Sequence, residues 1–131
     1  MRLESVQFLF HPERIWAIYE PRSATSRRNI FQREIAEALS LADFIALPEL
    51  FKPEKVPWGE RLDKNRLVAD LRDRGRNAWN LGDVEGIIRT VCQEARSGDL
   101  IVIMSNGGFG GIFERLPAAL ETVRAAGPRQ T

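Results

Sequence analysis

Short apolar runs alternate along the chain with longer stretches in which apolar and polar residues follow a helical period. Runs of five or six apolar residues, bounded by turn-forming residues, are typical of buried strands. The run that ends in Met104 is the clearest of them, and we expect it to be the most buried. The predicted strands span residues 14–19, 43–47, 77–81 and 99–104.

Each of these runs leads into a stretch that favours a helix, and three polar residues are suited to cap the first three helices. Ser26, Asp63 and Asp83 stand just before the periodic segments, where a side-chain oxygen can accept from free backbone N–H groups. In the first helix Ile30 and Phe31 are expected on the apolar face. The predicted helices span residues 26–42, 64–75, 84–98 and about 112–126.

Strands that alternate with helices of this length predict right-handed crossovers and a mostly parallel sheet covered on both faces. The expected fold is therefore a three-layer, doubly wound α/β domain of the Rossmann-like type. Its simplest strand order is 3-2-1-4. At 131 residues the chain should form a single domain, 1–131, with a core of about 14–126.

Composition narrows the choice of function class without naming one. The net charge of +1 argues against a bulk nucleic-acid or anionic-membrane binder, and no apolar run approaches the length of a membrane span. The single cysteine excludes an internal disulfide. We therefore expect a cytoplasmic protein with neither nucleic acid nor membrane as a partner.

The most unusual stretch is "SNGGFGG", which follows the last predicted strand and runs into a helix. With strand order 3-2-1-4, the ends of strands one and four flank the switch point, where ligands of such sheets bind. Glycines let a ligand approach the backbone, and arginines grip carboxylates or phosphates. The candidate residues for binding an anionic substrate or nucleotide are Arg22, Ser23, Thr25, Ser105, Asn106, Gly107, Gly108 and Gly110. The alternative is that the glycines only form a tight turn.

Other chemistries fail on spacing. The turn after the first strand has no glycine, so a dinucleotide fingerprint is excluded, and the chain has no G-x-x-x-x-G-K-[ST] phosphate loop. His11 is the only histidine and has no partners for a metal site or a catalytic triad. Trp16, Trp58 and Trp79 are expected to pack within the protein. We predict no catalytic residue and no metal site in this chain.

Two segments, "IYEPRSATS" and "GDLIVIMSNGGFGGI", carry a resemblance to a known family. Together they resemble the C-terminal domain of the Mur ligases, over about residues 14–125. The similarity is greatest to the branch that joins a murein peptide to UDP-N-acetylmuramate in peptidoglycan recycling or synthesis. Phe113 stands where members of the family commonly have histidine.

The resemblance implies a three-domain ligase of which this chain is the last domain. In that family the first domain binds the UDP-sugar, and the central domain binds ATP and Mg²⁺. The last domain brings the incoming amine and closes over the nucleotide. ATP activates the sugar carboxylate as an acyl phosphate, which the amine of the peptide attacks. This chain alone would be inactive, because its partners, the N-terminal and central domains, are missing.

Two other function classes fit parts of the pattern. A stand-alone anion- or nucleotide-binding module without catalysis needs only the loops at the switch point. A phosphoacceptor receiver domain shares the layered architecture, but it needs an acidic pair after the first strand and a lysine late in the chain. Here Glu20 is followed by Pro21, and no lysine follows Lys64. The receiver therefore ranks last.

Overall fold

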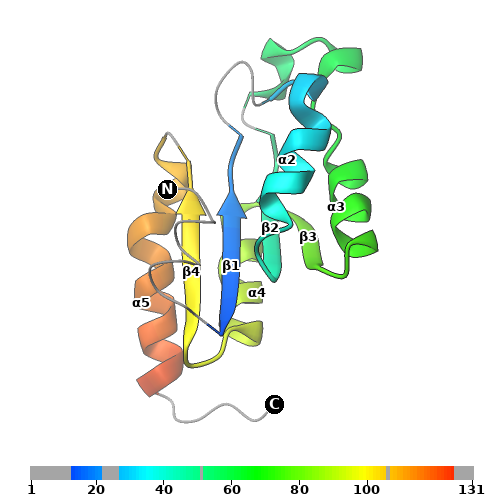
Figure 1. Cartoon of the computed structure of the whole chain (residues 1–131). Helices are drawn as coiled ribbons and strands as arrows, with labels where there is room; N and C mark the ends of the chain where they lie inside the picture. Colours follow the sequence, from blue (N-terminus) through cyan, green and yellow to red (C-terminus); the bar gives the residue numbers. More distant parts are fainter. Residues whose placement is uncertain (1–12, 22–26, 51, 106, 126–131) are drawn as a thin grey trace.

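A computed structural model describes residues 13–21, 27–50, 52–105 and 107–125. Its four strands form one sheet in which all neighbours are parallel, in the order β3-β2-β1-β4. This confirms the predicted strand order (Figure 1). The strands are β1 (Arg14–Tyr19), β2 (Phe44–Pro48), β3 (Asn77–Gly82) and β4 (Asp99–Met104).

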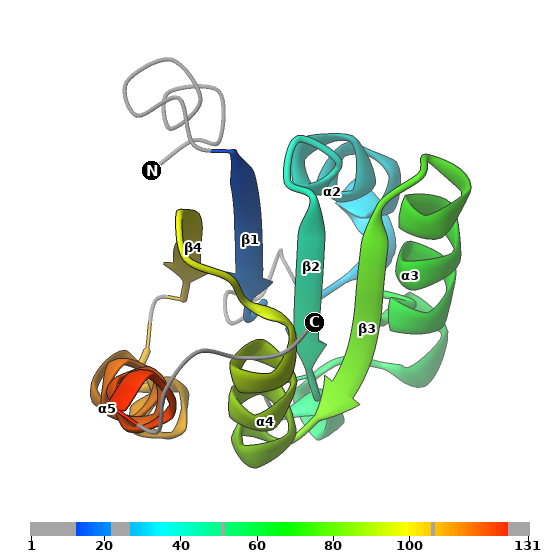
Figure 2. The same ribbon diagram turned by 90° about the horizontal axis from the view of Figure 1, so that it is seen from below.

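Helices cover both faces of the sheet, so the fold has three layers (Figure 2). On one side lie α2 (Gln32–Leu39) and α3 (Lys64–Asp73), and on the other α4 (Val84–Glu94) and α5 (Ile112–Ala125). In the described part of the chain no helix is long and apolar enough to cross a membrane. The described residues also form four 3-10 turns: η1 (Asn29–Phe31), η2 (Pro53–Lys55), η3 (Trp58–Glu60) and η4 (Phe109–Gly111).

The central strand β1 feeds both cores, because successive side chains of a strand point to opposite faces. Ile15 and Ala17 pack with α2 and α3, whereas Trp16 and Ile18 pack with α4 and α5. All four side chains are almost fully buried. A strand buried on both faces reads as one continuous apolar run, which is why the sequence identified it.

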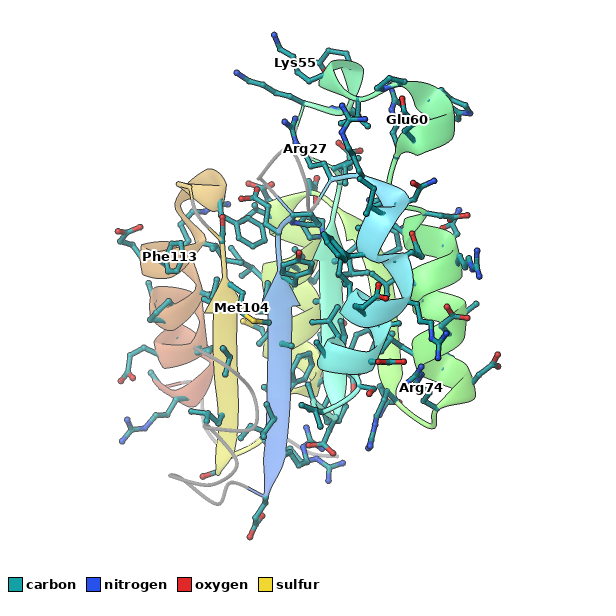
Figure 3. The ribbon with its side chains drawn as sticks, turned by 45° about the horizontal axis from the view of Figure 1, so that its top comes forward. Arg27, Lys55, Glu60, Arg74, Met104 and Phe113 are labelled. Atoms are coloured by element: carbon teal, nitrogen blue, oxygen red, sulfur yellow. The ribbon has the colours of Figure 1, made fainter. Side chains whose placement is uncertain are left out.

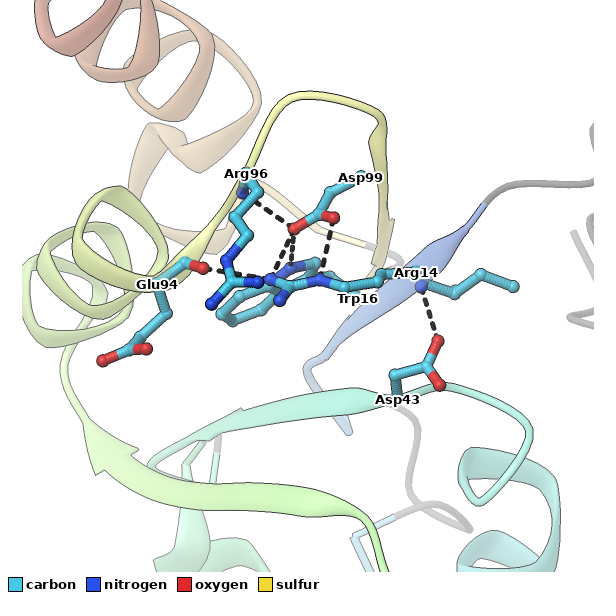
Figure 4. A network of polar contacts seen from close by, with 7 residues as sticks. Arg14, Trp16, Asp43, Glu94, Arg96 and Asp99 are labelled. Carbon is cyan, nitrogen blue, oxygen red and sulfur yellow. Dashed lines mark hydrogen bonds and ion pairs between the residues drawn. The ribbon is translucent and has the colours of Figure 1, made fainter. Parts of the chain in front are cut away.

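A buried carboxylate secures the amino-terminal end of the sheet (Figure 4). Asp99 of β4 accepts from Arg14 Nε and Nη2 at 2.9 and 2.8 Å, from Trp16 Nε1 at 2.9 Å and from Arg96 N at 2.9 Å. The ring of Trp16 also stacks on Phe44, at 4.5 Å between centroids. This network joins β1, β2 and β4 at the edge opposite the predicted site.

Two of the predicted helix caps are confirmed. Asp63 accepts from the backbone N–H of Arg66 at 3.0 Å, and Asp83 accepts from that of Gly86 at 2.8 Å. Gln32 links the start of α2 to the capping residue of α3, because its amide donates to Asp63 O and accepts from Asp63 N. The third expected cap, Ser26, lies outside the described residues.

Three expectations about burial are wrong. The first helix begins at Gln32, after η1, so Ile30 and Phe31 are 64% and 46% exposed. Trp58 does not pack in the interior: it is 82% exposed, with the guanidinium of Arg61 4.6 Å from its ring centroid. Strand β4 is half-buried along its whole length. It lies at the end of the strand order, where an apolar run does not guarantee burial on both faces.

Candidate functional site

The carboxyl ends of β1 and β4 meet, as the predicted switch point requires. Tyr19 pairs with Met104, and the backbone N–H of Glu20 donates to Met104 O at 2.9 Å. The segments that follow the two strands therefore start side by side (Figure 1). Of the predicted binding residues, Ser105, Gly107, Gly108 and Gly110 are described here. Arg22, Ser23, Thr25 and Asn106 lie outside the described residues.

A carboxylate that the sequence did not single out joins these two ends. Glu20 is only 9% exposed and accepts from Ser105 Oγ at 2.5 Å. Ser105 Oγ in turn accepts from the backbone N–H of Gly107 at 3.1 Å. The hydroxyl predicted to contact a ligand is thus engaged in fixing the start of the glycine-rich loop.

Different structural features account for the individual glycines of this loop. Gly110 has φ +58°, and a Cβ at this position would lie 2.8 Å from Val84 Cγ2. Gly111 also has positive φ, +75°. Both positions favour glycine through backbone conformation, and Gly110 also through close approach to α4. Gly108 has φ −69°, and a Cβ there would meet nothing within 4 Å. The structure gives no packing or conformational reason for glycine at this exposed position.

Phe109 anchors the loop between these glycines. Its φ is +45°, an unusual conformation for a bulky residue, and its side chain is 2% exposed in the core against α4 and α5. Strained backbone of this kind persists only where the surrounding structure holds it, and it is concentrated at functional sites. The buried ring holds the loop down while Gly108 stays at the surface.

Arg115 braces the same loop from α5. Its Nη1 donates to Gly110 O at 3.0 Å, and its Nη2 contacts Glu85 Oε1 of α4 at 2.5 Å. The side-chain hydrogen bond from Arg115 lowers the pKa of the Glu85 carboxyl. The loop is therefore held by an ion pair between the two helices of its layer.

The arrangement is suited to bind an anion. Gly107 and Gly108 stand between a strand end and the turn that opens α5, where backbone N–H groups favour negative charge. Within the described part of the chain, no cluster of three or more His, Cys, Asp or Glu could hold a metal ion.

A second polar group lies along the same edge of the sheet, at β2 and β3. The Lys64 ammonium, at the first position of α3, donates to Pro48 O at 2.7 Å and to Asn80 Oδ1 at 2.9 Å. Burial lowers the pKa of Lys64, and the charge of Glu49 opposes this effect. Figure 3 shows Lys55 and Glu60 on the segment between β2 and α3, which extends beyond this edge of the sheet.

Comparisons with known proteins point to one family. No protein-family model matches the chain. The UDP-N-acetylmuramate–L-alanyl-γ-D-glutamyl-meso-2,6-diaminoheptandioate ligase of Escherichia coli K12 is 36% identical over 103 residues, which are 79% of this chain and 20% of that ligase. The chain thus spans about a fifth of the length of this relative.

Two solved structures agree with this match. A murein peptide ligase of Psychrobacter arcticus superposes with a TM-score of 0.70 at 35% identity, over 90% of this chain and 24% of that one. A domain from a Haemophilus ducreyi ligase named for the same UDP-sugar and peptide superposes with a TM-score of 0.67 at 29% identity. That match covers 90% of this chain and 77% of the domain structure.

The sequence offered unequal signals for the residues it missed. Glu20 is a single acidic residue at the end of a buried strand, which is a weak signal. Nothing in the sequence marks Phe109 as left-handed, because aromatic residues rarely adopt that conformation. Lys64 could have been noticed in the sequence, because it follows the cap Asp63 at a position where acidic residues are favoured.

Proposed function

We propose that this chain, which is homologous to one part of the Mur ligases, is the C-terminal substrate-binding domain of an ATP-dependent ligase. The enzyme would join the amine of a murein peptide to the carboxylate of UDP-N-acetylmuramate, in peptidoglycan recycling or synthesis in the cytoplasm. The observation that carries the proposal is the hydrogen-bonded junction of Glu20, Ser105 and the glycine-rich loop, in a chain that matches such ligases.

The proposed amide formation needs no energy source other than ATP. A carboxylate oxygen of the sugar attacks the γ-phosphorus of ATP, which releases ADP and leaves an acyl phosphate. The uncharged amine nitrogen of the peptide then attacks the acyl carbon, and the C–O bond to phosphate breaks. An amide forms, phosphate leaves, and the nitrogen loses a proton. ATP and Mg²⁺, which supply phosphoryl transfer and charge neutralisation, would be held mainly by a central domain.

The contribution of this chain would be positioning. Backbone N–H groups around Gly108 would hold an anionic part of the substrate or nucleotide, since Gly108 is exposed and precedes the η4 turn that leads into α5. The Glu20–Ser105 contact would keep that backbone in place before the ligand arrives. Holding reactants in a fixed geometry lowers the entropic part of the barrier to amide formation.

A chimera of the Escherichia coli ligase tests this function. The segment that matches this chain is exchanged for the chain itself, and the purified chimera receives ATP, Mg²⁺, UDP-N-acetylmuramate and the tripeptide. We expect formation of ADP and of the peptide-linked UDP-sugar, detected by mass spectrometry. A chimera that melts cooperatively and still binds ATP, yet forms no product, would contradict the ligase assignment. It would favour a stand-alone anion- or nucleotide-binding module.

A further inference from the structure

Among the described residues, the Lys64 ammonium is in direct contact with neutral groups only. Its two hydrogen-bond acceptors, Pro48 O and Asn80 Oδ1, are both neutral. Among the residues that the structure describes, no carboxylate lies within 4.0 Å of the Lys64 nitrogen. Glu49 acts on it only through its charge at longer range. A lysine drawn into a half-buried position is ordinarily paired with an acidic group.

The two acceptors are nevertheless positioned to hold this side chain. Pro48 is the last residue of β2 and is buried, which fixes its carbonyl. Asn80 belongs to β3, and its amide nitrogen donates to Asn65 Oδ1 at 3.0 Å, which fixes the oxygen that faces Lys64. Three elements, β2, β3 and α3, therefore converge on one ammonium group.

The position of Lys64 in its helix adds to the cost of the charge. Lys64 is the first residue of α3, directly after the cap Asp63. The amino-terminal end of a helix carries a partial positive charge, so a cation there is unfavourable. Loss of hydration and the helix dipole both act against the ammonium form. A bound anion would relieve both effects.

We propose that Lys64 forms an anion subsite at the carboxyl ends of β2 and β3, for a carboxylate or phosphate group. Two donors of the ammonium are used by Pro48 and Asn80, which leaves the third for the anion. The subsite lies along the same edge of the sheet as the glycine-rich loop, because both follow the carboxyl ends of parallel strands. It rests on the proposed function only for the source of the anion, which would then be the peptide or ATP.

Lysine signals in NMR spectra test the subsite directly, because the chain contains only Lys52, Lys55 and Lys64. Lys52 and Lys55 are exposed and serve as internal references. With ¹³C-labelled lysine, the Cε signal of Lys64 should titrate below the ordinary lysine pKa of 10.5. Inorganic phosphate, acetate, the tripeptide and ATP are then added separately at constant ionic strength, with chloride as the reference salt.

We expect at least one of these anions to shift the Lys64 signal with saturation and to raise its pKa, while Lys52 and Lys55 respond only as they do to chloride. The murein tripeptide and ATP distinguish the two substrate sources, and phosphate and acetate report a free anion. If Lys64 responds to every anion no more than the two exposed lysines do, the subsite is refuted.

Two variants separate binding from structural support. In Asn80→Asp, a carboxylate replaces the amide oxygen that faces Lys64, so the pKa of Lys64 should rise and anion affinity should fall at least about tenfold. Lys64→Met should abolish saturable anion binding. Because this variant has no Lys64 signal, anion binding is followed at the backbone amide of Gly82 and by calorimetry. Melting curves establish that both variants fold. Undiminished affinity in either folded variant would overturn the proposal.

The two proposals fail separately. The Lys64 titration needs no ligase activity, so a chimera without product leaves it unaffected. Conversely, an active chimera whose Lys64 signal ignores every anion would keep the ligase assignment and remove only the subsite.

Discussion

At the scale of single residues, the glycines of the loop after β4 differ in how much they contribute to stability. Gly110→Ala would place a Cβ 2.8 Å from Val84 Cγ2 at a φ of +58°, so both strain and overlap oppose it. We expect the free energy of unfolding to fall by about 1–3 kcal/mol. Urea denaturation measures this change, and Gly108→Ala is the matched control because its Cβ meets nothing. Equal stability of the two variants would contradict this distinction.

In the sequence these glycines form one set, and only their surroundings in the folded protein distinguish them. Gly110 is fixed by the neighbouring helix and by Arg115, whereas Gly108 has no such reason. The pattern of apolar residues predicted the place of the loop correctly. It could not predict that Phe109 would take a left-handed conformation, since that depends on a pocket formed by α4 and α5.

At the scale of elements, the amino-terminal edge of the sheet depends on Asp99. Asp99→Ala would leave Arg14 Nε and Trp16 Nε1 without their acceptor, and the side chain of Asp99 is 4% exposed. Arg14 would keep its hydrogen bond from Nη2 to Glu94 O. We expect a loss of about 3 kcal/mol in the free energy of unfolding. The exposed pair Arg33–Glu37 provides the control, because Glu37→Ala should cost under about 0.5 kcal/mol. Similar losses in both variants would mean that the Asp99 network adds nothing beyond a surface pair.

The helix α3 carries a pH dependence through Lys64. Burial lowers the pKa of Lys64 in the folded protein, whereas in the unfolded chain it stays near 10.5. Between these two values the unfolded chain binds more protons, so the free energy of unfolding should rise with pH across this alkaline window. Lys64→Met lacks this titration. Urea denaturation of both proteins from pH 7 to 10.5 should show wild type gaining on the variant, and a constant difference would refute the lowered pKa.

Elements whose signal is local were predictable, and those set by tertiary contacts were not. Asp63 and Asp83 cap helices as expected because capping involves only the adjacent turn. The first helix starts at Gln32, whose amide pairs with Asp63 of another element, a contact that no periodicity reveals. Half of the predicted binding residues lie outside the described part of the chain, so their roles stay predictions.

At the scale of the whole molecule, two general rules were enough to predict which strand ends meet. Right-handed crossovers predicted a parallel sheet, and its simplest doubly wound arrangement predicted the order β3-β2-β1-β4, which brings the ends of β1 and β4 together. Strand order does not reveal which side chains occupy the edge. The contacts of Glu20 and Lys64 join residues that are far apart in the sequence, so only the structure reveals them.

The central claim is that the surface of the glycine-rich loop contacts a ligase substrate or nucleotide. Steady-state kinetics of the active chimera carrying Gly108→Ala test it most directly, with thermal melts of the same protein beside them. We predict an unchanged melting temperature, because the added Cβ meets no atom within 4 Å. We also predict a fall of about tenfold or more in kcat/KM for ATP, the UDP-sugar or the peptide, because the methyl blocks close approach to the backbone. Unchanged kcat/KM for all three substrates would show that this loop is only a turn.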